Sequence, residues 1–416
     1  MNILIITQWF DPEPNNMKAL SFAKMLRDKG NNVQVLTGFP NYPTGKIYEG
    51  YKLKQYQKEV IDGIIIHRVY LYPSHDKNKY KRMANYFSFG LSAAINGKRK
   101  IKGSIDIVYV YHPPITSTIA AFSIAKKKKA KVVLDVNDLW PDSISATGMM
   151  FNVKLLSRIG KWCLKTYKKA DAINVLSNGI KNLLIERGVI AEKISTIPVW
   201  CNEELLTGTR DENFYVEQEC NKHFTLIYAG AVGAAQGLDI ALDGAKELRE
   251  SIPSLQILII GTGTCADVLS KRVKEKNIDN VKILPPVPPE KVVPILNCAD
   301  ALFVNLKKDE LFSITVPSKI PLYMATGKVI IAGIEGDAAE IINNADCGVT
   351  FEPGNVEEFC SAVRKVYNLT DNERNIFAKN GLNYYKKFLS MDSGVDAFNN
   401  LFLSLNSNGT ESFVNE

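Results

Sequence analysis

The sequence predicts an α/β protein built from two doubly wound, Rossmann-like domains. Short apolar strands alternate with amphipathic helices over the first 200 residues, and the same alternation starts again near residue 224. Repeated β-α-β units form parallel sheets with helices on both faces. The 416 residues are enough for two domains of ordinary size. Ligands of such sheets bind beyond the carboxyl ends of the strands, so we expect the site in the cleft between the domains.

The first domain is expected over residues 1–200. Apolar or alternating runs predict strands at residues 2–7, 32–37, 63–69, 105–111, 131–136 and 172–176. Helical spacing of apolar residues predicts helices at 17–29, 83–97 and 153–169, with another between the strands at 105–111 and 131–136. In the first of these helices Leu20, Ala23 and Leu26 fall on one side.

The second domain is expected over residues 201–385, after a polar linker at 200–223. Its strands are predicted at residues 224–228, 255–260, 281–284, 300–304 and 328–332. Its helices are predicted at residues 238–251, 265–276, 289–297, 318–326, 337–343, 356–368 and 371–389. A C-terminal helix over 386–404 is expected to pack back on the first domain, and the polar tail 405–416 is expected to be disordered.

Charge is divided unevenly along the chain. The net charge is +7, but residues 1–200 carry 31 Lys and Arg against 14 Asp and Glu, whereas the remainder carries 20 against 30. The first half therefore suits an anionic partner such as a membrane or a pyrophosphate lipid, unless its charge is only a solvated surface. Nucleic acid is disfavoured, because the sequence contains no known nucleic-acid-binding motif. The longest uncharged apolar stretch, residues 83–97, is too short to span a bilayer.

Two glycine turns follow strands of the second domain. Gly230, Gly233 and Gly237 lie between a strand and a helix, and Gly261 and Gly263 follow the next strand. Glycine permits close approach of the backbone to a phosphate at a helix N-terminus. The spacing is not GxGxxG, so a plain tight turn explains these glycines about as well as a phosphate-binding turn does.

The segment 315–333, TVPSKIPLYMATGKVIIAG, is the strongest local element. Pro317 ends a loop, Ser318 is a candidate N-cap, and Lys319 falls in the first turn of a helix that Gly327 ends. A cation there opposes the helix dipole unless an anion sits beside it. We therefore expect Lys319 and free N–H groups to bind a diphosphate, the alternative being a solvated lysine.

Polar and aromatic residues also follow strands of the first domain. Asp138 and Trp140 in the segment 133–143 can orient sugar hydroxyls and stack on a sugar ring, whereas Asp142 can also cap the next helix. His112 ends another strand, where a satisfied core histidine is the stronger interpretation. The Pro- and Tyr-rich segment 38–51, with Tyr42, is typical of a functional loop.

No metal or covalent catalytic pattern is present. The sequence contains no DxD, HExxH or GxSxG motif, and its seven Cys form no CxxC pair. We therefore expect neither a cofactor nor a metal.

Taken together, these segments resemble the GT-B-fold glycosyltransferases of family 4, especially bacterial N-acetyl-L-fucosamine transferases of O-antigen and capsule synthesis. The resemblance is carried by ITQWFDPEP (6–14), GFPNYPTG (38–45), DLWPDS (138–143), YAGAVGAAQGLD (228–239) and PSK…YMATGK (317–328). It implies a retaining, metal-independent transfer from a UDP-sugar, with the donor in the second domain and the acceptor in the first. The implied donor is an N-acetylated deoxyaminosugar such as N-acetyl-L-fucosamine.

The chain departs from the family pattern at the donor site. Ala231 and Gln236 stand where the family has an Arg and a Lys for the donor phosphates, and Leu322 and a position near Ile314 replace two glutamates. The resemblance thus leaves Lys319 as the main diphosphate ligand. It also implies backbone contact of Val287, in the turn PPVPP, with the base.

The resemblance further implies an undecaprenyl-diphosphate-linked acceptor at the cytoplasmic face of the inner membrane. The apolar helix 83–97 lies between basic clusters and could rest in the interface, with Lys126–Lys129 adding attraction to lipid. A buried helix packed on the first sheet is the competing interpretation.

Two other functions stay open at this point. A nucleotide-sugar 2-epimerase can share the architecture, although the basic first domain favours transfer. A non-catalytic scaffold of a polysaccharide assembly complex would account for the missing glutamates.

Overall fold

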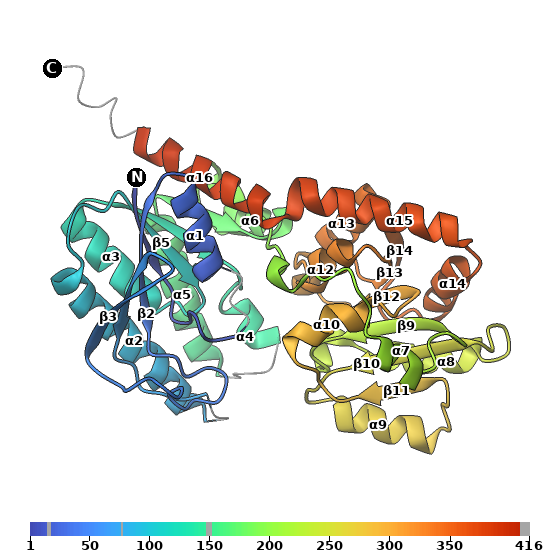
Figure 1. Ribbon diagram of the computed structural model, residues 1–416. Helices are drawn as coiled ribbons and strands as arrows, with labels where there is room; N and C mark the ends of the chain where they lie inside the picture. Colours follow the sequence, from blue (N-terminus) through green and yellow to red (C-terminus); the bar gives the residue numbers. More distant parts are fainter. Residues whose placement is uncertain (15–17, 76–77, 147–151, 408–416) are drawn as a thin grey trace. The chain divides into compact units, whose positions relative to one another are not determined.

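The computed structural model describes residues 1–14, 18–75, 78–146 and 152–407 and divides the chain into two compact units (Figure 1). Unit 1 comprises residues 1–198 together with the chain from Met391 onward, and unit 2 comprises Val199–Ser390. Each is an α/β unit around one largely parallel sheet. The predicted fold class is confirmed. None of the described helices is long and apolar enough to cross a membrane.

The sheet of unit 1 has the order β3-β4-β2-β1-β5-β6-β7-β8. Its strands are β1 Asn2–Ile6, β2 Asn32–Gly38, β3 Tyr56–Ile61, β4 Ile64–Val69, β5 Ile107–His112, β6 Lys131–Val136, β7 Ala172–Val175 and β8 Ile194–Thr196. Only β3, which the apolar pattern did not predict, pairs antiparallel. Asp62 and Gly63, both with positive φ, form the two-residue turn of this hairpin.

Helices α1 to α6 and α16 belong to unit 1 (Figure 1). They are α1 Leu20–Asp28, α2 Lys79–Lys100, α3 Ser117–Lys128, α4 Asp142–Ala146, α5 Val153–Lys169, α6 Asn178–Glu186 and α16 Met391–Ser407. The α2 helix begins earlier than predicted because Asn78 accepts hydrogen bonds from the N–H groups of Tyr80 and Lys81, at 3.0 and 3.3 Å. The expected start of the first helix, Met17, lies outside the described residues.

The C-terminal helix α16 packs on the first helix of unit 1. Its Phe398 contacts the rings of Phe22 and Tyr109, each with centroids 5.5 Å apart, and Asp392 and Asp396 pair with Lys29. The helix continues to Ser407, three residues into the segment expected to be disordered, and residues 408–416 lie outside the described part. Burial of these aromatic rings fixes α16 to unit 1.

The sheet of unit 2 is wholly parallel, in the order β11-β10-β9-β12-β13-β14. Its strands are β9 Phe224–Ala229, β10 Leu255–Ile260, β11 Val281–Leu284, β12 Ala301–Asn305, β13 Val329–Gly333 and β14 Gly348–Phe351. Its helices are α7 Glu212–Glu217, α8 Asp239–Leu248, α9 Ala266–Glu275, α10 Pro289–Leu296, α11 Glu310–Ser313, α12 Lys319–Thr326, α13 Asp337–Ala345, α14 Val356–Tyr367 and α15 Asp371–Tyr384.

The segment predicted as a polar linker is part of unit 2. Cys201 and Cys220 are buried in its core, and Phe214 and Tyr215 of α7 pack against the same core. The apolar residues of this segment are few and have no helical period, so the sequence did not predict that the segment packs on the core of unit 2. The helix predicted over 371–389 also differs, because α15 ends at Tyr384 and a π-helical turn follows over Tyr385–Leu389.

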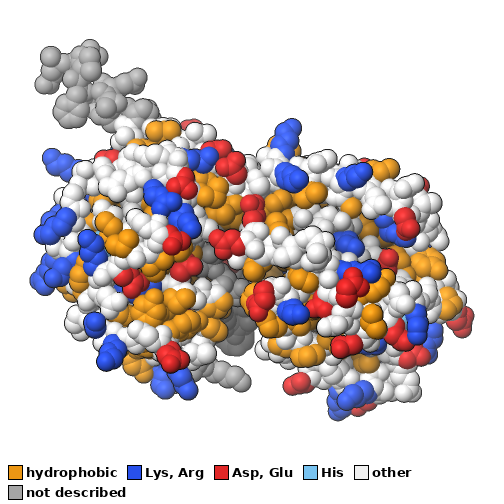
Figure 2. Space-filling view, viewed as in Figure 1, with side chains coloured by type: hydrophobic (Ala, Val, Ile, Leu, Met, Phe, Trp, Pro, Cys, Tyr) orange, Lys and Arg blue, Asp and Glu red, His pale blue; other side chains and the backbone are white. Residues whose placement is uncertain are grey.

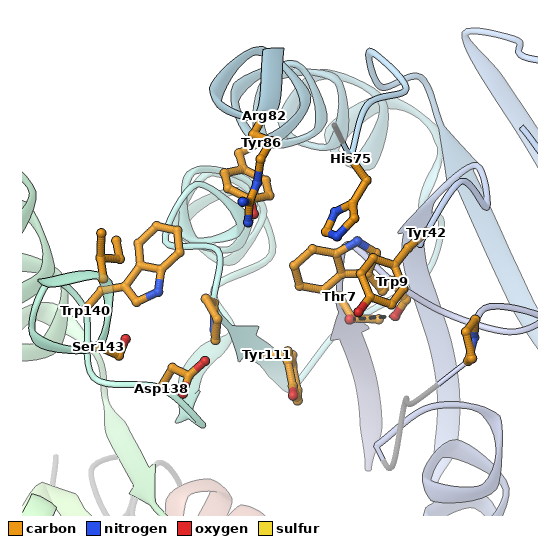
Figure 3. A pocket seen from close by; sticks show the side chains of 13 residues that line it. Thr7, Trp9, Tyr42, His75, Arg82, Tyr86, Tyr111, Asp138, Trp140 and Ser143 are labelled. Carbon is orange, nitrogen blue, oxygen red and sulfur yellow. Dashed lines mark hydrogen bonds between the residues drawn. The ribbon is translucent and has the colours of Figure 1, made fainter. Parts of the chain in front are cut away.

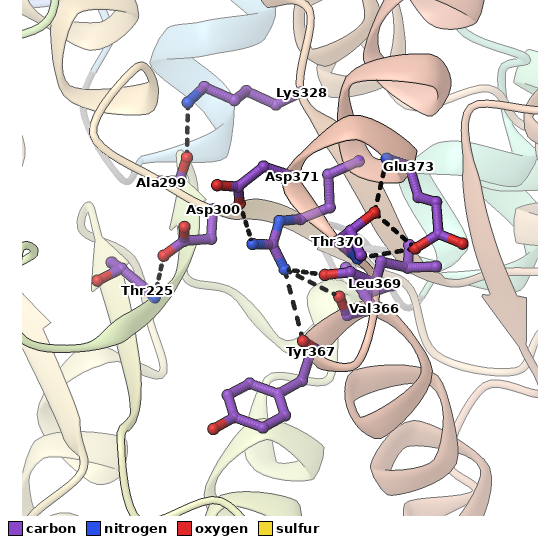
Figure 4. Close-up of polar contacts among 11 residues, drawn as sticks. Thr225, Ala299, Asp300, Lys328, Val366, Tyr367, Leu369, Thr370, Asp371 and Glu373 are labelled. Atoms are coloured by element: carbon purple, nitrogen blue, oxygen red, sulfur yellow. Dashed lines mark hydrogen bonds and ion pairs between the residues drawn. The ribbon is translucent and has the colours of Figure 1, made fainter.

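Charged side chains at the amino ends of the unit 2 strands are used within the fold (Figure 4). Asp300 accepts a 2.8 Å hydrogen bond from the Thr225 N–H, and Lys328 donates to the Ala299 carbonyl at 2.7 Å. Arg374 donates to the carbonyl of Leu369 at 2.8 Å and pairs with Asp371. These charged groups are therefore paired within unit 2. Ligands of parallel sheets bind at the opposite edge, beyond the carboxyl ends of the strands.

Candidate functional site

Two glycine turns lie against each other at the carboxyl edge of unit 2. A Cβ on Gly261 would fall 1.8 Å from the Gly230 carbonyl oxygen, and one on Gly263 would fall 2.3 Å from that of Val232. Gly230 and Gly261 also have φ of +139° and +151°. The N–H of Val232 donates to the Thr262 carbonyl at 2.9 Å. These glycines therefore allow two backbone segments to meet, and the tight-turn interpretation holds for this contact.

The turn around Gly233 and Gly237 is closed by side chains of its own unit. The Gln236 side-chain oxygen accepts the Gly233 N–H at 3.0 Å, and the buried Asn305 amide donates to the Gln236 carbonyl at 2.7 Å. Lys307 lies beside the same turn, because a Cβ on Gly237 would come within 3.0 Å of its Cγ. Lys307 was not predicted as a site residue, although its position just after β12 places it at the carboxyl edge of the sheet.

Lys319, the first residue of α12, points back across the glycine turns. Its Nζ lies 4.8 Å from the centroid of the Tyr228 ring, and a Cβ on Gly230 would lie 2.7 Å from it. Burial lowers the pKa of Lys319 to about 8, and no acidic group among the described residues opposes this shift. A partly buried cation with no counter-ion among the described residues is suited to binding an anion.

The backbone around Lys319 adds donors to this site. Ser318 occupies the N-cap position but has helical φ and ψ, and its side chain makes no capping hydrogen bond, contrary to expectation. Within the described residues the N–H groups of Ser318 and Lys319 have no hydrogen-bond partner, whereas Pro317 accepts the Ile320 N–H at 3.0 Å. Free N–H groups at a helix N-terminus favour a bound anion. Gly327 ends the helix in the left-handed conformation, as predicted.

The remaining donor-site positions are apolar. Leu322 and Val287 pack, partly buried, against the core of unit 2, and Ile314 is also partly buried. Tyr323 accepts the Ala229 N–H at 3.1 Å, and Tyr228 donates to the Ala231 carbonyl at 2.5 Å. These tyrosines fix the turn on which Lys319 rests. No group of His, Cys, Asp and Glu among the described residues is arranged to hold a metal ion.

A pocket of about 360 Å³ lies in unit 1 beyond the carboxyl ends of β1, β5 and β6 (Figure 3). Its lining residues are Thr7, Trp9, Pro14, Tyr42, His75, Arg82, Tyr86, Tyr111, Pro113, Asp138, Trp140, Ser143 and Ile144. The aromatic rings contact one another, with centroids of Trp9 and Tyr42 5.8 Å apart and those of Tyr86 and Trp140 6.1 Å apart. Such a wall suits the apolar face of a sugar ring.

Asp138 places a carboxyl group in this aromatic pocket. Burial raises the pKa of Asp138 to about 6, and no other cause contributes. A carboxyl group of this kind is ionised at neutral pH and accepts hydrogen bonds from the hydroxyl groups of a ligand. Three predicted residues, Asp138, Trp140 and Tyr42, are thus brought together.

Two other predicted acceptor residues lie elsewhere. His112 is wholly buried, contacts the Tyr167 hydroxyl at 3.2 Å through Nε2, and has its pKa lowered to about 3 by burial. Asp142 forms a bidentate pair with Arg187, at 2.6 and 2.8 Å. Both positions are occupied by contacts within the protein, so neither is free to bind an acceptor, and the core interpretation of His112 is the better one.

Four residues of the pocket wall that were not predicted as site residues come from distant segments. Trp9 follows β1, His75 precedes α2, and Arg82 and Tyr86 lie one turn apart on α2. The buried Glu13 carboxylate connects the segment after β1 to the loop that contains Tyr42. It accepts the N–H groups of Phe10, Asn41 and Tyr42 at 3.0, 2.7 and 2.8 Å. No local pattern marks such a wall, because its residues meet only in the folded unit.

Comparison with known proteins agrees with these two units. Residues 19–204 match the family model described as Glycosyltransferase Family 4, and residues 209–384 match that of Glycosyl transferases group 1. The chain is 22% identical over 378 residues to the protein named colanic acid biosynthesis glycosyl transferase WcaI of Escherichia coli K12, covering 88% of this chain and 92% of that one.

Solved structures show the same fold. Sucrose-phosphate synthase of Thermosynechococcus elongatus superposes with a TM-score of 0.72 at 14% identity, over 98% of this chain and 100% of the other. HepE of Anabaena, in complex with UDP, superposes with a TM-score of 0.67 at 12% identity, over 97% of this chain and 100% of the other.

Proposed function

Because the chain belongs to the GT-B-fold glycosyltransferases, with a family 4 N-terminal part and a group 1 C-terminal part, we propose that it transfers a sugar from a UDP-sugar to a lipid-linked glycan of a surface polysaccharide. The name of its relative WcaI and the UDP bound by its structural neighbour HepE support this choice. We place the donor in unit 2 and the acceptor in the pocket of unit 1.

The observation that carries the proposal is Lys319, a partly buried lysine that has no ion-pair partner among the described residues. In the transfer the bond from the anomeric carbon to the diphosphate breaks and a bond to an acceptor oxygen forms. The acceptor proton passes to the departing diphosphate. Negative charge on this leaving group is stabilised by the Lys319 ammonium and by the N–H groups of Ser318 and Lys319. The transfer proceeds with retention and needs no metal in this proposal.

UDP is expected to raise the melting temperature of the protein by several degrees. UDP at 100 times its Kd for the folded state adds about 2.7 kcal/mol to the free energy of unfolding.

Transfer is tested by incubating the protein with UDP-sugars, including UDP-N-acetyl-L-fucosamine, and a lipid-diphosphate-linked sugar. The anomeric configuration of the product is read by NMR. An epimer formed from donor alone would point to an epimerase, and UDP binding without turnover on any acceptor would point to a scaffold.

We also propose that unit 1 rests on an anionic membrane. Four large apolar side chains on one face of α2 are exposed: Tyr80 76%, Phe87 39%, Leu91 54% and Ile95 50%. The opposite face, with Phe89 and Ala93, is buried, so the packing of α2 on its unit leaves the first face available for the proposed contact with lipid. Trp162 of α5 stacks on Phe87, with centroids 6.0 Å apart.

Basic residues border this apolar stripe. Lys127 of α3 donates to the Lys98 carbonyl at 2.6 Å, which joins the cluster at the end of α2 to Lys126–Lys129. Figure 2 shows Lys and Arg side chains along the edge of unit 1 that carries α3. Apolar side chains flanked by cations are typical of a surface that binds anionic lipid.

The double variant Phe87→Ser, Leu91→Ser is expected to lower affinity for vesicles containing phosphatidylglycerol about 10-fold or more, because two apolar side chains no longer enter the interface. Co-sedimentation measures the affinity, and raising NaCl from 0.05 to 0.5 M should release the wild-type protein. The matched control is Val216→Ser, which changes a 68% exposed side chain of unit 2. Binding that is indifferent to both changes would contradict the membrane proposal.

A further inference from the structure

The pocket of unit 1 carries a positive wall that the proposed function does not use. Arg82 extends into the pocket from α2, beside Tyr86, and His75 faces the same space (Figure 3). The Arg82 side chain has no hydrogen-bond or ion-pair partner within the part of the chain that the structure describes. His75 packs edge-on against Tyr42, with centroids 4.6 Å apart. Arg82 thus gives this wall a positive charge that no acidic group among the described residues pairs with.

The pocket also keeps its two charged groups apart. Asp138 lies across the aromatic floor from Arg82 (Figure 3). Burial raises the pKa of Asp138, whereas burial and, to a smaller extent, the charge of Arg82 lower the pKa of His75. A cation and a carboxylate that line one pocket without pairing can both bind the same ligand, if that ligand presents an anion at one end and hydroxyl groups at the other.

We infer that this pocket binds a sugar ring joined to a phosphate, with the phosphate at Arg82 and the ring hydroxyls at Asp138. The inference deepens the proposed function and rests on it. The rings of Trp9, Tyr111 and Trp140 supply the apolar wall between the two polar ends. The volume of about 360 Å³ is near the lower limit for ligand pockets, so the pocket itself holds one or two sugar rings. In a lipid-diphosphate-linked acceptor, the phosphate at Arg82 is the one bonded directly to the acceptor sugar.

Two water-soluble acceptors with the same sugar test this inference, one a short-chain alkyl diphosphate sugar and the other a neutral alkyl glycoside. In Arg82→Gln the KM for the diphosphate acceptor should rise about 10- to 100-fold, since a charge-assisted hydrogen bond is lost, while that for the neutral glycoside stays unchanged. Arg82→Lys should recover part of the affinity. Lys81→Gln removes an equal charge from the adjacent, exposed position and should alter neither value.

Direct binding separates this inference from the proposed function. Trp9 and Trp140 line the pocket, so quenching of tryptophan fluorescence reports occupancy without turnover. We expect the alkyl diphosphate sugar to bind more tightly than free N-acetylglucosamine 1-phosphate, and Arg82→Gln to weaken both. Equal affinity for the two ligands would overturn the assignment of the bound phosphate to a lipid diphosphate. Unchanged affinity for both in Arg82→Gln would overturn the phosphate subsite, whereas Arg82-dependent binding without any transfer would contradict only the proposed function.

Discussion

Lys319→Ala is expected to lower the rate of sugar transfer by about 10²- to 10³-fold, because the leaving diphosphate loses its buried cation. Lys319→Arg should keep part of the rate, and Lys291→Ala, at an exposed position of α10, should keep all of it. The measurement is kcat with a UDP-sugar and a lipid-linked acceptor. Turnover of Lys319→Ala within a few-fold of the wild type would reject the donor site.

The charge of Lys319 also sets a pH dependence. Burial lowers its pKa to about 8 in the folded protein, so UDP affinity should fall as the pH rises through 8 and the ammonium is lost. The unfolded chain, with a lysine pKa of about 10.4, binds more protons between pH 8 and 10.4, and stability therefore rises with pH over that window.

Lys319→Met isolates this effect of the buried charge. It should raise the free energy of unfolding at pH 7 by roughly 1–3 kcal/mol without UDP and abolish the rise above pH 8. Thermal unfolding over pH 7–10.5 measures both. A variant less stable than the wild type at pH 7 would show that the ammonium is compensated by a group within the protein.

Asp138→Asn is expected to lower transfer by about 10²-fold and to remove the rise of the wild-type rate through pH 6. The rise follows from the pKa of about 6, since the carboxylate that accepts the acceptor hydroxyl forms only above it. The free energy of unfolding depends on pH in the opposite direction to the rate. The folded pKa lies above the unfolded value, so the wild-type protein loses stability as the pH rises from about 4 to 6, and Asp138→Asn does not.

The matched control is Asp142→Asn, four residues further along the chain. Asp142 is bound by Arg187, so its replacement should lower the melting temperature but leave the KM for acceptor and the pH profile of the rate unchanged. Equal losses of rate in both variants, with the same pH profile, would remove Asp138 from the acceptor site.

Local periodicity was sufficient for most of the fold. The central strands β1, β5, β9 and β10 are nearly continuous apolar runs, which a parallel sheet buried on both faces requires. The unpredicted strands β3, β8 and β14 lie at the sheet edges, where few residues are buried and the apolar signal is weak.

The two α/β units, the glycine turns and the position of Lys319 at the start of a helix follow from local patterns in the chain. Which of these residues have unusual chemistry depends on contacts that form only in the folded protein. Lys319 is partly desolvated because Tyr228 of β9 and the following Gly230 lie against its side chain, and Arg82 shares a pocket with Asp138 because residues of α2 line the space beyond the ends of β1, β5 and β6. Burial, pKa and charge pairing depend on neighbours distant in the chain, which no local pattern encodes.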